Sequence, residues 1–127
     1  MNKRELLKLL DSLNLPKTEY YILSSGSMLL YGLRDIANDL DLCVSNELFK
    51  HLKEKYNLNE NNKNDSGFYK ISEDIEIIPN DKKNFKMDYI NGYPVENLKT
   101  ILEFKEKRNL PKDKKDIENI KKYLNII

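Results

Sequence analysis

The amino-acid sequence predicts an α+β fold in which helices flank a small β-sheet, and three observations support this. Apolar residues recur at helical spacing near both ends of the chain, in 6–13 and 98–124. Short runs of aromatic and aliphatic residues lie between these ends, and Asn91-Gly92 separates two of them as in a type I′ hairpin. The chain has 127 residues, the length of one domain. We therefore expect a single domain over 1–127, with the C-terminal helices of 96–127 packing on it.

Hydrophobic periodicity and turn residues divide the chain into elements. The elements expected in chain order are a helix over 6–13, a strand over 19–24, a short helix over 28–33, a strand over 39–44, a helix over 47–56, strands over 68–71 and 75–78, a hairpin of 87–90 and 93–95, and two final helices carrying 98–104 and 117–124. The mostly polar segment 57–67 is expected to form a surface loop. Ser45 or Asn46 can cap the helix that begins at residue 47.

Composition restricts the environment of the chain. Charged residues make up 34% and hydrophobic residues 39%, a balance typical of soluble globular proteins. No apolar run approaches the roughly 20 residues that span a bilayer, so no membrane partner is expected. We expect a cytoplasmic protein, and the single cysteine, Cys43, agrees with a reducing compartment. The formal net charge of +1 implies no broad cationic field. Lysine-rich segments at 82–86, 99–108 and 112–122 could steer a polyanion or form solvated helix faces.

A glycine-serine turn and two acids lie close together in the sequence. Gly26-Ser27, between a strand and a helix, would let backbone N–H groups approach phosphate oxygens. Asp39 and Asp41 stand at i and i+2 on a predicted strand, so they project to one face about 7 Å apart and can share a cation. Such carboxylates repel each other, and Mg²⁺ with phosphate groups relieves that repulsion. The alternative is that both acids line the solvent face of an edge strand while the alternating leucines form the core.

This arrangement resembles the minimal nucleotidyltransferase domain of the DNA polymerase beta superfamily, in which Gly-Ser, a helix and Asp-x-Asp follow one another. It is most similar to the bacterial and phage branch that includes abortive-infection toxins, where Gly-x-Arg precedes the acids as Gly32-Leu33-Arg34 does here. The resemblance covers residues 20–45 in detail and the later strands and helices more loosely. It implies a nucleotidyltransferase fold, with a small mixed β-sheet flanked by helices, and transfer of a nucleoside monophosphate from ATP or another nucleoside triphosphate to a hydroxyl acceptor, with Mg²⁺ or Mn²⁺.

The resemblance also implies the residues of the site. They are, for catalysis and metal binding, Asp39, Asp41 and Glu76, with Asp74 as the alternative to Glu76, and, for nucleotide binding, Gly26, Ser27, Arg34, Lys105 and Lys112. Glu76 is favoured over Asp74 because β-forming isoleucines flank it, whereas Asp74 can belong to a turn. Lys105 and the pair Lys112-Asp113 could contact phosphate or fix the last helices against the site. The chain departs from the family at Ala37, where many relatives carry Ser or Thr.

The acceptor and the partners stay open at this stage. A transfer RNA end, a protein hydroxyl or a small aminoglycoside-like molecule would each supply the hydroxyl. In so short a chain, acceptor binding would fall to the last helices, to a second copy in a homodimer or to a partner protein. Two other functions compete with the enzyme: a catalytically inactive nucleotide-binding or protein-interaction module of the same fold, and an unrelated α+β interaction domain.

Overall fold

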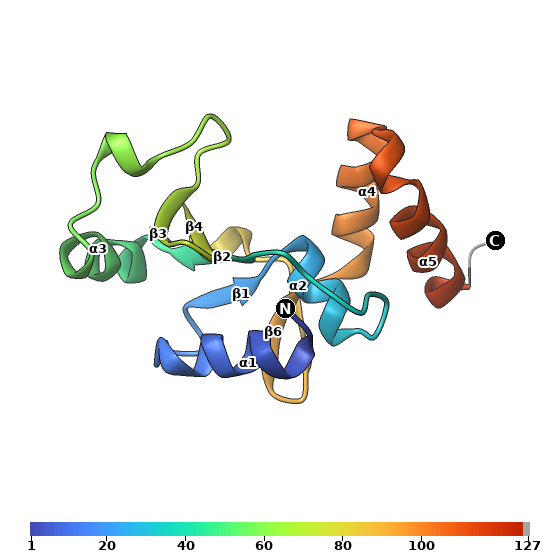
Figure 1. Cartoon of the computed structure of the whole chain (residues 1–127), viewed down its shortest axis with the longest axis horizontal. Coiled ribbons are helices and arrows are strands. Elements are labelled where there is room, and N and C mark those ends of the chain that lie inside the picture. The colour runs from blue at the N-terminus through green and yellow to red at the C-terminus, as the bar shows by residue number, and fades with distance from the viewer. Residues whose placement is uncertain (126–127) are drawn as a thin grey trace.

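The computed structural model describes residues 1–125, and the chain forms a mixed β-sheet with helices around it (Figure 1). The helices and strands are α1 (Lys3–Ser12), β1 (Tyr20–Ile22), α2 (Ser24–Leu30), β2 (Leu40–Ser45), α3 (Asn46–Lys55), β3 (Tyr69–Ser72), β4 (Ile75–Asn80), β5 (Met87–Ile90), β6 (Tyr93–Glu96), α4 (Leu98–Arg108) and α5 (Lys114–Leu124). Short 3₁₀ turns cover Glu60–Asn62, Lys82–Asn84 and Pro111–Asp113. The expected α+β class, with a small sheet flanked by helices, is confirmed.

The sheet has six strands in the order β3-β4-β2-β1-β6-β5. β2 is antiparallel to β1 and parallel to β4, and β1 is parallel to β6. The two edge strands, β3 and β5, pair antiparallel with β4 and β6. β2 is therefore a central strand, with a neighbour on each side, and this position excludes the alternative in which its acids lie on an edge strand.

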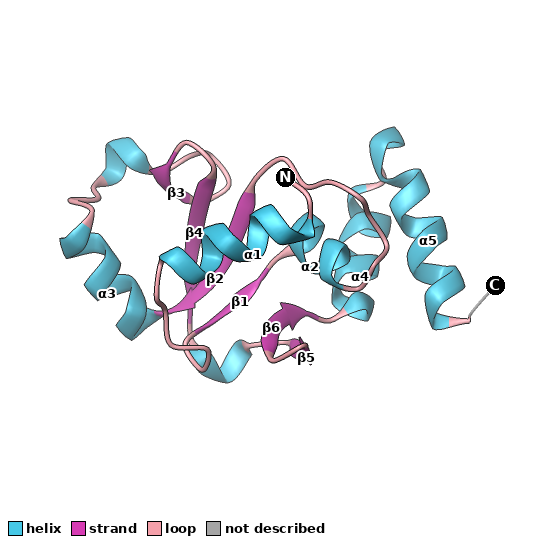
Figure 2. Ribbon diagram, turned by 60° about the horizontal axis from the view of Figure 1, so that its bottom comes forward, coloured by secondary structure: helices cyan, strands magenta, loops and turns pink. Residues whose placement is uncertain are grey.

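Alternation along β2 separates the two faces of the sheet. Leu40, Leu42 and Val44 are fully buried in the main hydrophobic core, which α1 and α3 complete with leucines. Figure 2 shows α1 lying across the strands. Asp41 and Cys43 alternate with these residues and belong to the opposite face. A second, smaller core joins α2 to α4 and α5, so the last two helices stand beside the sheet (Figure 1).

Local signals placed most elements correctly. Asn91 and Gly92 have φ angles of 52° and 82°, and they join β5 to β6 as a type I′ turn requires. The Ser45 hydroxyl accepts the Leu48 N–H at 3.1 Å and caps α3. None of the helices in residues 1–125 has both the length and the apolar character needed to cross a membrane.

The short helix expected over 28–33 is wrong at both ends. α2 begins at Ser24, one residue beyond the end of β1, so Gly26-Ser27 lies inside its first turn and does not form a separate loop. It ends before Gly32, whose φ of 79° is incompatible with a right-handed helix. The strand expected from residue 39 starts at Leu40, which leaves Asp39 just outside the hydrogen-bonded ladder.

Candidate functional site

The central feature of the site is a pair of acids on adjacent parallel strands. Asp41 of β2 is the direct register partner of Glu76 of β4. Residues in register on neighbouring strands point to the same face and have closely spaced side chains. The pair lies on the face opposite the main core, and both residues are half-buried.

The environment of Asp41 disfavours its charged form. Burial, together with the neighbouring charges of Glu76 and Asp39, raises the pKa of Asp41 to about 6. Its Oδ1 atom is shielded from solvent and has no hydrogen-bond partner. A buried, unpaired carboxylate oxygen is costly unless a cation or donor approaches it. The oxygen-donor set around Asp41 therefore fits a hard divalent cation such as Mg²⁺.

The other two candidate acids lie at the margin of this pair. Asp39 is exposed and precedes β2, close enough for its charge to act on Asp41. Asp74 is exposed in the turn between β3 and β4, where its carbonyl accepts the Leu40 N–H at 2.8 Å. Glu76, on β4 itself, is thus the acid that the sheet places beside Asp41. As placed in residues 1–125, no three acidic, histidine or cysteine side chains form a metal-binding cluster.

Asn64 joins the polar segment 57–67 to the acid pair. Its Nδ2 donates to Glu76 Oε2 at 2.9 Å, and its Oδ1 accepts the N–H groups of Ser66 and Phe68 at 2.9 and 3.0 Å. One side chain therefore orders the loop tip and orients one oxygen of Glu76. Sequence reasoning missed this residue, because an asparagine in an asparagine-rich loop carries no distinguishing signal.

Gly26 and Ser27 are buried by packing. A Cβ atom on Gly26 would stand 2.7 Å from Ile22 Cγ2 and 3.3 Å from Leu6 Cδ1, so glycine lets α2 pack against β1 and α1. Ser27 is 0% exposed, and its hydroxyl donates to the Glu96 carbonyl at 2.6 Å. Gly26 and Ser27 therefore face the protein interior. Ser24 and Ser25 are the half-buried residues of this turn.

The first turn of α2 lies beside the acid strand. Leu23, which precedes the helix, donates its N–H to the Asp41 carbonyl at 2.9 Å. The Ser24 N–H donates to Glu96 Oε1 at 2.9 Å. The residue that leads into α2 is thus in direct hydrogen-bond contact with the Asp41 end of β2.

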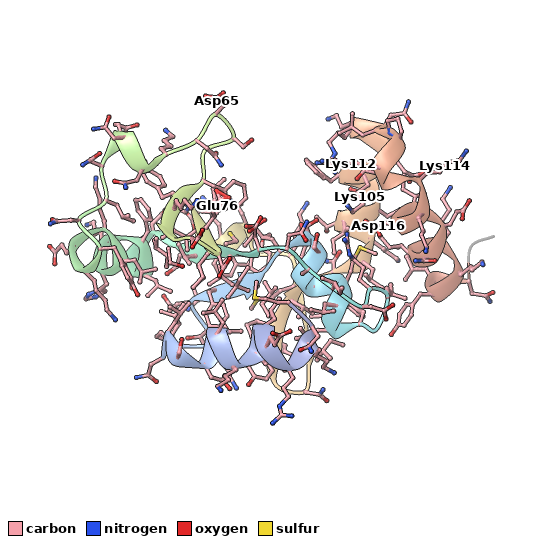
Figure 3. All side chains as sticks on the ribbon, viewed as in Figure 1. Asp65, Glu76, Lys105, Lys112, Lys114 and Asp116 are labelled. Atoms are coloured by element: carbon pink, nitrogen blue, oxygen red, sulfur yellow. The ribbon has the colours of Figure 1, made fainter. Side chains whose placement is uncertain are left out.

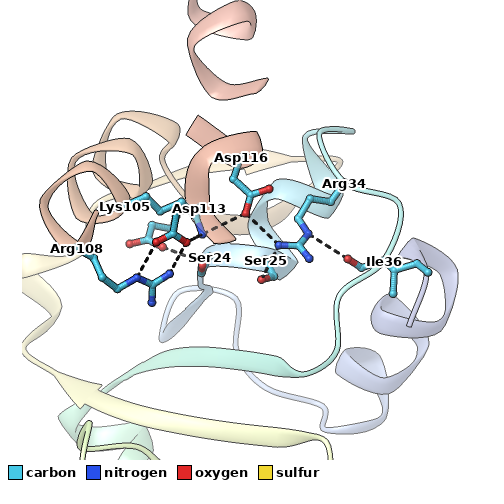
Figure 4. A network of polar contacts seen from close by, with 9 residues as sticks. Ser24, Ser25, Arg34, Ile36, Lys105, Arg108, Asp113 and Asp116 are labelled. Atoms are coloured by element: carbon cyan, nitrogen blue, oxygen red, sulfur yellow. Dashed lines mark hydrogen bonds and ion pairs between the residues drawn. The ribbon is translucent and has the colours of Figure 1, made fainter. Parts of the chain in front are cut away.

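Arg34 belongs to an ionic network that links the segment after α2 to the last two helices (Figure 4). Its guanidinium donates to Asp116 Oδ2 at 3.1 Å, to the Ile36 carbonyl at 3.2 Å and to Ser25 Oγ at 3.4 Å. Lys105 Nζ lies 3.3 Å from a carboxylate oxygen of both Asp113 and Asp116. The network therefore brings Arg34 and Lys105 together on one carboxylate, that of Asp116.

The two candidate lysines occupy different environments. The Lys105 side chain is only 4% exposed, and Asp113 is shared between it and Arg108. The hydrogen bond from Arg108 lowers the pKa of Asp113 to about 2. Lys112 is exposed, and Figure 3 shows it near the Lys114 end of α5, across the molecule from Glu76. Lys105 therefore joins α4 to the start of α5 through Asp113 and Asp116.

Glu96 and Asp116 are polar residues of the site region that sequence reasoning did not identify. Asp116 stands three residues after the noted Asp113, a helical spacing that would have placed both on one face. Glu96 ends an apolar strand and has no comparable signal.

Comparison of the chain with protein-family models, curated proteins and solved structures finds no match.

Proposed function

We propose that this chain is a Mg²⁺- or Mn²⁺-dependent nucleotidyltransferase of the abortive-infection-like branch of the polymerase beta superfamily. It would transfer a nucleoside monophosphate from a nucleoside triphosphate to a hydroxyl acceptor. The observation that carries the proposal is the in-register pair of Asp41 and Glu76 beside the first turn of α2. In this pair, Asp41 Oδ1 is buried and has no hydrogen-bond partner. Two carboxylates plus substrate phosphates are a common ligand set for Mg²⁺.

The residues of the chain would share the work as follows. Asp41 and Glu76, with Asp39 at the margin, would hold the cation, which when bound neutralises the triphosphate and polarises the α-phosphate. The Ser25 hydroxyl and the partly exposed Arg34 guanidinium, in contact at 3.4 Å, would bind phosphate oxygens. Buried Lys105 would hold the last helices in place without contacting the substrate.

The proposed reaction is an in-line displacement. The acceptor oxygen attacks the α-phosphorus and forms a new P–O bond, while the bond from that phosphorus to the bridging oxygen breaks. Pyrophosphate leaves with the electron pair, and Glu76 takes the proton of the acceptor hydroxyl. The arrangement favours positioning and charge neutralisation as the main contributions to rate.

The test is a transfer assay with α-labelled nucleoside triphosphates, which follows pyrophosphate release and label incorporation into RNA, protein and aminoglycosides. Asp41→Asn, Glu76→Gln and Asp39→Ala should each reduce transfer, the first two by roughly 100-fold or more. Asp74→Asn, the matched control in the adjacent turn, should change it by less than about twofold. Undiminished transfer by Asp41→Asn would refute the assignment.

The same preparation distinguishes the competing functions. Nucleotide binding without pyrophosphate release would favour a catalytically inactive module of the same fold. A chain whose stability responds neither to Mg²⁺ nor to nucleotides would instead be an interaction domain with incidental acids.

A further inference from the structure

The helix α2 lacks a cap of its own. Its N-cap residue is Leu23, whose side chain has no polar atom and makes no capping hydrogen bond. The first N–H groups of a helix have no partner within the helix, so they need acceptors from elsewhere. Glu96, 72 residues away at the end of β6, supplies one, because its Oε1 accepts the Ser24 N–H at 2.9 Å.

Glu96 makes a second contact with the same turn. Its main-chain carbonyl accepts the Ser27 hydroxyl at 2.6 Å. The residue before it, Val95, is fully buried and is the register partner of Ile22 on β1. The end of β6 is therefore fixed to the sheet and to the first turn of α2 at two points.

The surroundings of the Glu96 carboxylate connect it to the ionic network. Burial raises the pKa of Glu96, while the Ser24 N–H and the positive charge of Lys105 oppose that shift. Lys105 contacts Asp116, Asp116 contacts Arg34, and Arg34 reaches Ser25. Glu96 thus lies within the electrostatic influence of Lys105, and the contacts that start at Lys105 return to α2 at Ser25 through α5 and the segment after α2.

We infer that Glu96 is a positioning residue, whose carboxylate replaces the missing cap of α2 and fixes its first turn against the Asp41 end of β2. Leu23 donates its N–H to the Asp41 carbonyl at 2.9 Å, so movement of this turn changes its placement relative to the acid. The catalytic consequence rests on the proposed function. The capping role itself is independent of that function.

Amide hydrogen exchange in the full chain tests the cap directly. In Glu96→Leu, which removes the acceptor oxygen but keeps a similar volume, exchange of the Ser24 amide should accelerate roughly fivefold to tenfold. In Glu96→Gln, which keeps an acceptor oxygen, it should change by less than about twofold, and the same should hold for Glu103→Leu, an exposed control on α4. Unchanged Ser24 exchange in Glu96→Leu would overturn the inference, as would equal acceleration in Glu96→Gln.

Steady-state kinetics test the positioning role. Glu96→Leu should raise KM for the nucleoside triphosphate and lower kcat/KM, and Glu96→Gln should restore most of both. A purely structural role would lower the active fraction and leave KM unchanged, and that result would reject the catalytic part. If the wild-type chain transfers no nucleotide, the proposed function fails, and amide exchange still decides whether Glu96 caps α2.

Discussion

Asp41 stands directly opposite Glu76 in the parallel register of β2 and β4, so two carboxylates share one face of the sheet. Both residues are half-buried on the face opposite the main core. Asp41 has lost part of its hydration, and one of its oxygens has gained no hydrogen bond in return. Burial of this unpaired carboxylate lowers the free energy of unfolding. Stability measurements can therefore test the placement of Asp41 without any assay of activity.

The contribution of Asp41 to the stability of the wild-type chain should fall as pH rises from about 4 to 6. The pKa of Asp41 is raised from 3.8 to about 6 by burial, so the unfolded chain releases this proton first and the folded chain later. Asp41→Asn should therefore be more stable than wild type by about 1–2 kcal/mol at pH 7.5, and the difference should vanish near pH 4.

Urea unfolding at both pH values measures this difference. Asp39→Asn is the matched control, because Asp39 is exposed and its removal should give a much smaller pH-dependent gain. An equal difference between wild type and Asp41→Asn at pH 4 and pH 7.5 would contradict the assignment of the titration to Asp41.

Divalent cations should stabilise the wild-type chain at neutral pH. A cation that binds only the folded state at about ten times its dissociation constant adds about 1.4 kcal/mol. Thermal unfolding with Mg²⁺ or Mn²⁺ should show the increase, and EDTA should reverse it. Asp41→Asn and Glu76→Gln should lose the response, while Asp74→Asn should keep it. A response that survives in Asp41→Asn would place the cation elsewhere.

Gly26→Ala should destabilise the domain even though alanine favours helices. Helix propensity gains at most about 1 kcal/mol. The new Cβ would stand 2.7 Å from Ile22 Cγ2, and overpacking of this kind costs about 1–3 kcal/mol. We expect a net loss of about 1–2 kcal/mol in urea unfolding. Lys8→Ala, at an exposed position of α1, is the control and should be nearly neutral; a stabilised Gly26→Ala would show that α2 has room to move.

Lys105→Met and Lys112→Met should differ sharply in stability. Removing Lys105 leaves the buried Asp113 and Asp116 with one basic partner each, Arg108 and Arg34, so we expect a loss of about 3 kcal/mol. Lys112 is exposed, and its substitution should change stability by less than about 0.5 kcal/mol. Denaturant midpoints of the two variants measure the contrast, and similar losses would show that the buried network contributes little.

Signals carried by a few neighbouring residues were sufficient for much of the fold. Period-two alternation from Leu40 to Val44 separated core-facing leucines from Asp41, and the burial pattern of β2 agrees. Asn91-Gly92 specified its hairpin, because both residues readily adopt positive φ angles. Glu76 lies on a strand and Asp74 in a turn, as their neighbours in the sequence predicted, since flanking isoleucines are a local property.

The predicted start of α2 was wrong because contacts with distant residues, and not local propensity, decide where this helix begins. Serine and glycine at 24–27 are weak helix formers, so the sequence favoured a turn there. Contacts with distant residues change the balance: the Glu96 carboxylate accepts the Ser24 N–H, and the Glu96 carbonyl accepts the Ser27 hydroxyl. Tertiary hydrogen bonds supplied what local propensity lacked.

The sequence by itself determined the class of the fold, the alternation along the strand that carries Asp41 and the Asn91-Gly92 turn, because each shows in residues a few positions apart. The tertiary structure alone decided which polar side chains lie close to each acid and which basic side chains form ion pairs. Asn64 reaches Glu76 across 12 positions, and Arg34 reaches Asp116 across 82. Such pairings depend on strand order and helix docking, which arise from burial summed over the whole chain and leave no periodic trace in it.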